Sequence, residues 1–438
     1  MFRRSLAVTC VAATAFAAAA VVHADTLAGF LSRGRLSGQL RAYEFTRDYS
    51  TASTVNARAF SLAGLLDYRT APFLDGFSLG ASFYTANALG SRNSDPAQVD
   101  ATLMGPTNAI NALGQAFVQY SGHAVLVRLG DQLITTPWAG SSDSRALPAT
   151  YRGAYGTYSP VAGLTLTAVR ILRFKGRTAD GFFADNNYYP ATWMGDANYG
   201  GIGNLPARAR AARGTLAFGA AYGRSGLKAS AWYYRFYGFA HMLYGQVDAT
   251  LPIHSPLAPF AGVQVVREWG RLNRFAETAT RFFGQPGTAV DNLTLGAIAG
   301  VKARGASLSV AYDQLRRAGP GALGAGVLIS PYTAGYATDP LYTTSMIRGM
   351  VELGPGHAWK VRASEAALGE RLLLSASYAV YRTDFQGHDS EIYFGVIYRP
   401  RGSVKGLTLR NRLGISRGAA NPGRGSFIYN RVMVTYAF

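Results

Sequence analysis

Two residues of opposite charge, Asp143 and Arg145, stand two positions apart in the stretch 133–148, which reads LITTPWAGSSDSRALP. A carboxylate and a guanidinium at this spacing can recognise a charged ligand through ion pairing and bidentate hydrogen bonds. The same stretch carries Trp138, an apolar side chain that is better packed inside a protein than left in water. We therefore expect the stretch to fold inward, with Asp143, Ser144 and Arg145 as candidate binding residues. The alternative is an ordinary Ser-Asp-Ser surface turn.

The overall charge is strongly positive, with 43 Lys and Arg residues against 24 Asp and Glu residues and a formal net charge of +19. These cations are scattered along the chain instead of forming the Lys/Arg runs of a nucleic-acid-binding segment. Arginine far outnumbers lysine, which favours bidentate recognition of carboxylate or phosphate groups. The expected partners are therefore small anions or anionic lipid headgroups, and no nucleic acid is expected.

Several kinds of chemistry are excluded or weakly supported. The only cysteine, Cys10, lies in a segment expected to be removed, so the mature chain is expected to have no disulfide, thiol nucleophile or Cys-ligated metal. Most of the histidines of the mature chain lie at expected turns or loops, and none is paired with a convincing serine nucleophile. The five histidines are His123, His241, His254, His357 and His388. No catalytic residues, metal or cofactor are expected.

The elements that must position these residues are β-strands. After residue 24 no continuous apolar stretch reaches the roughly 20 residues of a transmembrane helix, whereas alternation of apolar with polar or small residues recurs throughout. Eighteen segments fit: 35–45, 57–69, 76–87, 113–121, 124–132, 150–158, 162–173, 209–222, 227–239, 242–251, 259–269, 292–302, 305–317, 357–366, 371–382, 389–399, 405–416 and 426–438.

A further segment, 341–353, also alternates. A closed antiparallel barrel with both termini on one side needs an even number of strands. We therefore assign 318–356 to one long loop, which could contain a hairpin of its own.

The connections support a membrane barrel. Short ones, such as 121–123 and 303–304, alternate with long ones, such as 133–149 and 270–291, as do the periplasmic turns and extracellular loops of outer-membrane barrels. The chain ends in RVMVTYAF, the usual form of a final strand offered to the barrel-assembly machinery. The fold class is therefore predicted to be all-β, a transmembrane antiparallel β-barrel of about 18 strands, with residues 133–149 as its third outward connection.

Residues 1–24 have the pattern of a secretory signal peptide: two arginines, an apolar run, and the small-residue cleavage site Val22-His23-Ala24. An uncleaved anchor helix is the alternative. We expect cleavage after Ala24, a barrel domain over 25–438, and a location in the outer membrane of a Gram-negative bacterium.

Strand parity predicts which charges face the bore. In 407–413 the leucines share one face, so Arg410 and Arg412 share the other; because a charge on the lipid face near the midplane costs about 2–4 kcal/mol, both arginines should point inward. The same argument places six more cations inward: Arg41, Arg128, Lys302, Lys360, Arg362 and Arg431. Few acids are expected there. Together these residues would form a positive track, whereas each taken singly could be part of a merely solvated wall.

The chain resembles the OprD-type family of substrate-specific outer-membrane porins over nearly its whole mature length. The matching stretches are GQLRAYEFTRD (38–48), DGFSLGASFY (75–84), LGDQ (129–132), TPW (136–138), DSRALP (143–148), GPGHAW (354–359) and KGLTLRNR (405–412). The resemblance implies a monomeric eighteen-stranded barrel whose third and seventh loops form a narrow eyelet, reached along a ladder of basic residues. A loose trimer is the alternative. His357 stands where the family often has Glu, and Arg362, Ala363 and Ser364 replace acidic positions.

The expected function is passive, selective diffusion of small hydrophilic solutes, anionic or carboxylate-bearing, with Asp143 setting what the positive bore lets through. The partners would be the solute, outer-membrane lipid and, during biogenesis, the assembly machinery. Two alternatives stay open: a structural or adhesive barrel with an occluded pore, and an outer-membrane hydrolase.

Overall fold

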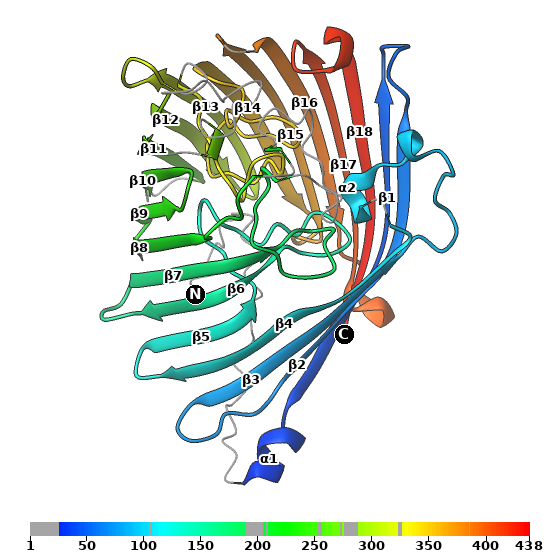
Figure 1. The fold of residues 1–438 in the computed structure, drawn as a ribbon, viewed down its shortest axis with the longest axis vertical. Coiled ribbons are helices and arrows are strands. Elements are labelled where there is room, and N and C mark those ends of the chain that lie inside the picture. The colour runs from blue at the N-terminus through cyan, green and yellow to red at the C-terminus, as the bar shows by residue number, and fades with distance from the viewer. Residues whose placement is uncertain are drawn as a thin grey trace.

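The computed structural model describes residues 26–105, 107–189, 205–206, 209–251, 256–271, 274–275, 288–322, 326–384 and 386–438. Its strands form one antiparallel 18-stranded sheet in which each strand pairs with its sequence neighbours. The first strand pairs with both the second and the last, so the sheet closes into a barrel (Figure 1). The expected signal peptide and its cleavage site at Ala24 lie outside the described residues and stay a prediction.

The strands are β1 (Arg35–Tyr49), β2 (Ala57–Arg69), β3 (Phe77–Asn87), β4 (Ala109–Gly122), β5 (Val125–Gln132), β6 (Thr150–Tyr158), β7 (Leu164–Lys175), β8 (Thr215–Arg224), β9 (Leu227–Phe236), β10 (Ala240–Thr250), β11 (Leu257–Gly270), β12 (Val290–Ala303), β13 (Ala306–Arg317), β14 (Gly356–Ala367), β15 (Leu372–Thr383), β16 (Gly387–Tyr398), β17 (Leu407–Gly418) and β18 (Ser426–Ala437). Two short α-helices are present in the described residues, α1 (Leu27–Ser32) and α2 (Ala101–Met104). Neither is long and apolar enough to cross a bilayer.

The predicted fold class is confirmed, and each of the eighteen predicted segments corresponds to a strand. Several boundaries differ by a few residues, and two of these differences have a clear physical reason. β4 begins at Ala109 because a bulge opposite Ser82 and Phe83 absorbs the extra residue Gly114, so pairing continues beyond the predicted start. β8 begins at Thr215, not at 209, because Gly214 takes a left-handed backbone conformation with φ 72° that ends the extended chain.

Each strand has an apolar outer face and a mixed inner face. On β18, for example, Val432 and Tyr436 are 44% and 41% exposed on the outside, whereas Arg431 and Met433 are buried on the inside. This period of two follows from the pleat of a strand. Closure removes both sheet edges, so that the ladder satisfies the backbone hydrogen bonds of every strand where no water is available.

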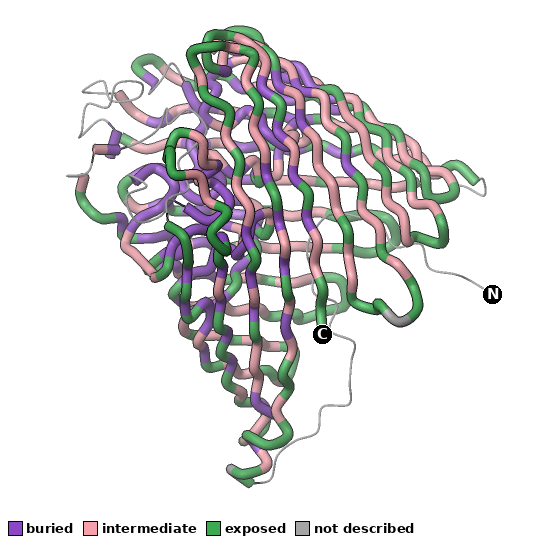
Figure 2. The backbone as a smooth tube through the Cα atoms, turned by 90° about the vertical axis from the view of Figure 1, so that its right-hand side faces the viewer, coloured by how far each residue is buried: buried purple, intermediate pink, exposed green. Residues whose placement is uncertain are grey.

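The start of β1, the end of β18 and the short turns lie at one end of the barrel, and most long connections lie at the other. Two connections at the loop end are short, between β9 and β10 and between β15 and β16, so the alternation of lengths is not strict. The third loop (133–149) and the seventh loop (318–322 and 326–355) are largely buried inside the wall. Figure 2 shows that many of the buried residues are gathered inside the barrel wall. The segment 341–353 lies in the seventh loop and forms no strand, as expected.

Gly153 allows a second bulge, between β6 and β7. The register shifts between Arg152 and Gly153, and a Cβ atom on Gly153 would collide with the carbonyl oxygen of Arg170 and crowd the Cα of Ile171. The backbone there cannot move without breaking the ladder. Only glycine therefore fits at position 153, because the backbone of β7 approaches too closely for a side chain.

We expect Gly153→Ala to lower the free energy of unfolding by about 1–3 kcal/mol through this overpacking. The measurement is thermal unfolding in detergent, monitored through the loss of the β-sheet signal in circular dichroism. Gly223→Ala is the matched control, because a Cβ on Gly223 meets nothing within 4 Å. Equal melting temperatures for the two variants would contradict the assignment.

Candidate functional site

The third loop crosses the inside of the barrel from one wall to the opposite wall. At one end Trp138 is fully buried; its backbone N–H donates to the Tyr234 hydroxyl at 3.3 Å, and its ring meets Tyr244 edge-on at 6.0 Å. Tyr234 and Tyr244 belong to β9 and β10, which lie about half-way around the closed sheet from β1. At its other end the loop contacts Arg41 of β1. The third loop therefore spans the lumen and is anchored on one side at β9 and β10 and on the other side at β1.

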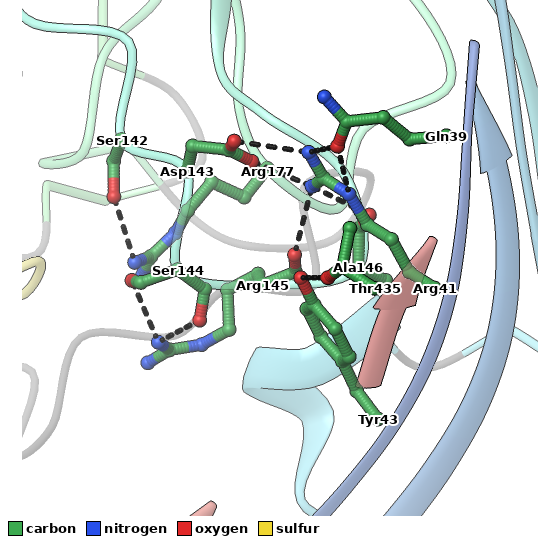
Figure 3. A network of polar contacts seen from close by, with 10 residues as sticks. All are labelled: Gln39, Arg41, Tyr43, Ser142, Asp143, Ser144, Arg145, Ala146, Arg177 and Thr435. Atoms are coloured by element: carbon green, nitrogen blue, oxygen red, sulfur yellow. Dashed lines mark hydrogen bonds and ion pairs between the residues drawn. The ribbon is translucent and has the colours of Figure 1, made fainter. Parts of the chain in front are cut away.

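Asp143 and Arg41 form the anchor at β1 (Figure 3). The guanidinium donates to the carboxylate in bidentate fashion, Nη1 to Oδ1 at 2.6 Å and Nη2 to Oδ2 at 2.9 Å. Nη1 also donates to the Ala146 carbonyl at 3.2 Å, and Nη2 donates to Gln39 Oε1 at 2.8 Å. The Arg41 side chain is 3% exposed, while that of Asp143 is 35% exposed. One arginine thus fixes the loop and leaves an edge of the carboxylate accessible.

Arg145 lies differently from the expectation that it faces the passage. Its side chain is 1% exposed, and its guanidinium lies 5.4 Å from the Phe45 ring and 5.9 Å from the Tyr429 ring. Its Nη1 donates to the carbonyl and hydroxyl oxygens of Ser144 at 3.0 and 3.2 Å. Planar guanidinium groups stack well on aromatic rings, which explains why the loop turns this side chain onto the wall.

Asp100, in the second loop, explains how the charge of Arg145 is accommodated. Burial alone would raise the pKa of the Asp100 carboxyl, but Arg47 and Arg145 beside it hold that pKa below its usual value. Arg47 Nη2 lies 2.9 Å from Asp100 Oδ1. The carboxylate is therefore ionised next to both guanidinium groups, which offsets the cost of burying them.

The seventh loop is tied to carboxylates on the inner wall. Glu391 of β16 accepts hydrogen bonds from the backbone N–H groups of Met346, Ile347 and Arg348, at 2.9, 3.0 and 2.9 Å. Asp313 of β13 accepts from the N–H and the hydroxyl of Thr343, at 2.7 and 2.6 Å. Neither carboxylate side chain is exposed. The wall thus supplies acceptors for donors that an irregular loop cannot satisfy by itself.

Two further inner-wall acids hold the same loop. Glu268 of β11 accepts from the N–H of Ile329 at 3.1 Å, and Asp248 of β10 accepts from the Tyr342 hydroxyl at 2.8 Å. The expectation of few inward acids was wrong, because strand register places six described carboxylates on the inner face. They are Asp67, Asp248, Glu268, Asp313, Asp389 and Glu391.

The register also puts all eight cations of the predicted ladder on the inner face. Four lie together on β1, β17 and β18: Arg412 pairs directly with Arg431, Arg410 comes two residues before Arg412, and Arg41 lies on the adjacent β1. Arg431 is 2% exposed, with its guanidinium 4.1 Å from the Tyr429 ring. Arg410 and Arg412 are half-buried.

The other four cations are spread around the wall. Lys360 is almost buried because its Nζ donates to the Thr344 carbonyl at 2.7 Å, whereas Arg362, two residues away on β14, is exposed. Arg128 on β5 donates to Gln119 at 2.6 Å, and Lys302 on β12 lies 4.8 Å from the Phe260 ring. The structure does not bring Arg128 and Lys302 into contact with the third loop.

Arg177, in the fourth loop, was missed by the sequence analysis. Its Nη1 donates to Ser142 of the third loop at 3.3 Å (Figure 3). Its guanidinium lies 3.4 Å from the ring of Tyr336 in the seventh loop, so Arg177 joins the two loops. No sequence signal pointed to it, because it stands outside the alternating segments. The inner acids, in contrast, could have been found by the same parity argument that found the arginines.

A closed barrel crossed by anchored loops and lined by cations defines a channel-type membrane protein. The family model described as "outer membrane porin, OprD family" matches residues 28–320, about two thirds of the chain. The chain belongs to the OprD family of outer membrane porins, proteins of the Gram-negative outer membrane for selective uptake of small solutes. A search of the curated proteins found no match.

Solved structures agree with this fold at low identity. OccK9 (OpdG) of Pseudomonas aeruginosa has a TM-score of 0.72 and 19% identity, covering 94% of this chain and 99% of that one. OpdK of the same organism, solved with vanillate, has a TM-score of 0.71 and 16% identity over 94% and 100%. OccK2 (OpdF) of Pseudomonas aeruginosa, solved in complex with glucuronate, has a TM-score of 0.68 and 18% identity, covering 94% of this chain and 97% of that one.

Glu391→Gln should loosen the seventh loop. The amide replaces one acceptor oxygen by a donor that faces backbone N–H groups, and each buried donor left without an acceptor costs about 1–3 kcal/mol. We expect hydrogen exchange of the amides of residues 346–348 to accelerate by about tenfold or more, since 1.4 kcal/mol corresponds to a factor of ten.

Glu365→Gln is the control for this measurement, because Glu365 of β14 is an exposed carboxylate near the turn end of the barrel. It removes the same charge without touching the loop. Unchanged exchange in Glu391→Gln, or an equal change in both variants, would contradict the anchoring role of Glu391.

Proposed function

We propose that this porin is a selective passive channel for small anionic solutes, in particular carboxylate-bearing nutrients. One observation supports the anionic preference above all others. Four of the six inner-wall acids are at most 1% exposed and accept hydrogen bonds: Glu268, Asp313, Asp389 and Glu391. Of the eight cations of the predicted ladder, Arg128, Lys302, Arg362, Arg410 and Arg412 remain accessible. The charge that a solute meets is therefore mostly positive.

The proposed path follows from where these cations stand. A carboxylate drawn by the positive lumen would exchange water for guanidinium hydrogen bonds at Arg362, Arg410 and Arg412 in turn. Each contact is partly solvated, so a solute would leave as readily as it entered. Beside the third loop the solute would meet the exposed edge of Asp143, whose charge is partly offset by Arg41. Asp143 would then disfavour solutes that carry a second negative charge close to the first.

The structures of relatives give a consistent chemical class. OpdK was solved with vanillate and OccK2 with glucuronate, and each of these ligands carries a carboxylate. OpdK and OccK2 are 16% and 18% identical to this chain, so their ligands indicate a chemical class and not the particular solute. They make aromatic acids and sugar acids the first solutes to test.

Single-channel recording in planar bilayers tests both the channel function and the anion preference. Stable current steps are expected from the folded protein, and a reversal potential in a salt gradient should show anion preference. Arg410→Gln together with Arg412→Gln should lower that preference, because two of the accessible inner cations are lost. Absence of conductance would contradict the channel function, and cation preference of the unaltered protein would contradict only the anionic preference.

Arg417→Gln is the matched control. Arg417 lies on the same strand as Arg410 and Arg412, but register places it on the outer face, where it is exposed. Its replacement should leave the reversal potential unchanged. A shift as large as that of the double variant would mean that net charge, and not the lining of the lumen, sets the selectivity.

A further inference from the structure

A row of basic and aromatic side chains crosses the outer face of β7 to β11. Backbone register links its members in order: Arg170, Leu216, Arg235, His241 and Trp269. Arg170 points outward because Val169 and Ile171, on either side of it, belong to the buried core inside the wall. Arg235 points outward for the same reason, since Tyr234 and Phe236 lie in that core.

Two of these cations share one aromatic ring. The guanidinium carbon of Arg170 lies 4.9 Å from the Tyr237 ring centroid, and that of Arg235 lies 4.8 Å from it. Two positive charges are thereby held within about 10 Å, roughly one Debye length, where they repel each other. An anion placed between them would remove this repulsion.

Backbone carbonyl groups orient Arg170, but no described carboxylate neutralises the arginines on this outer face. Arg170 donates to the carbonyl oxygens of Ile171, Thr215 and Arg213, the last two at 3.2 and 3.0 Å. Arg213 itself is exposed, as is Arg235. Among the described residues, no ion pair includes Arg170, Arg213 or Arg235. We call these three arginines and Tyr237 the outer basic patch.

The neighbouring side chains place this patch at the level of lipid headgroups. Trp269 stacks on His241 with ring centroids 5.6 Å apart, and the Tyr233 hydroxyl lies 2.8 Å from His241 Nδ1. Such outward aromatic groups mark the membrane interface of a barrel. Below them the outer face becomes apolar, with Leu243 and Val247 50% and 43% exposed. The long loops follow the same strand ends, so the interface is that of the outer leaflet.

We propose that the outer basic patch binds the phosphate group of a phosphorylated lipid of the outer leaflet. Arginine forks match phosphate oxygens in bidentate geometry, and the Tyr237 hydroxyl can donate a further hydrogen bond. The acyl chains of the same lipid would lie along the apolar outer face, beside Leu216 and Phe218 of β8. This interaction surface is separate from the lumen and does not depend on the proposed solute preference.

The test uses the purified full-length porin in detergent and lipid A as the probe. Binding is measured by native mass spectrometry with phosphorylated lipid A, with chemically dephosphorylated lipid A, and with inorganic phosphate as competitor. The unaltered protein should retain the phosphorylated lipid. Arg170→Gln with Arg235→Gln should weaken that binding by about tenfold or more, as expected for loss of two charge-assisted contacts, and should leave the reversal potential of the channel unchanged.

Two variants control for folding and for net charge. Arg170→Lys with Arg235→Lys keeps both charges but removes the guanidinium forks, so its binding should lie between that of the unaltered protein and that of the Gln double variant. Arg304→Gln with Arg401→Gln removes two exposed cations at the turn end of the barrel and should change nothing. Equal binding of dephosphorylated lipid A, displacement by inorganic phosphate alone, or full binding by the Gln double variant would overturn the proposal.

Discussion

The interior of this barrel depends on hydrogen bonds between carboxylates of the wall and backbone N–H groups of the seventh loop. Glu391 satisfies three successive donors, Asp313 satisfies Thr343, and Glu268 satisfies Ile329. A buried carboxylate without partners would be costly, and so would a buried irregular loop without acceptors. Each therefore makes the other possible. Without these acids, the backbone N–H groups of Ile329, Thr343 and residues 346–348 would lose their acceptors.

This arrangement separates the charges of the lumen. Glu268, Asp313 and Glu391, which anchor the seventh loop, are removed from water, whereas cations such as Arg362 and Arg412 keep contact with it. The anchors at the third loop differ, because there a buried cation, Arg41, holds a partly exposed acid, Asp143. The two loops thus use opposite charges of the wall. The proposed anion preference rests on this difference in burial between the acids and the cations of the wall, and not on the net charge of the chain alone.

The sequence predicted what depends on the period of two and missed what depends on contacts distant in the chain. Alternation gave the eighteen strands and the inward direction of Arg410 and Lys360, because the pleat alone determines both. It could not show that Arg145 turns onto Phe45, or that Glu391 meets residues 346–348, since such contacts join segments without periodicity. The inward folding of the third loop was indicated by its apolar residues, but its route across the lumen required the structure.

The same parity also separates two uses of arginine on one strand. Arg412 and Arg417 of β17 are an odd number of residues apart, so they face the lumen and the outside respectively. On the outside, height along the strand decides whether an arginine is tolerated: the cost near the bilayer midplane is about 2–4 kcal/mol but falls to about 0–1 kcal/mol near the interface. Arg170 and Arg235 stand beside the aromatic row, where this cost is small. Their charges therefore need no partner inside the protein, and a phosphate of the surrounding lipid is the complement that we propose.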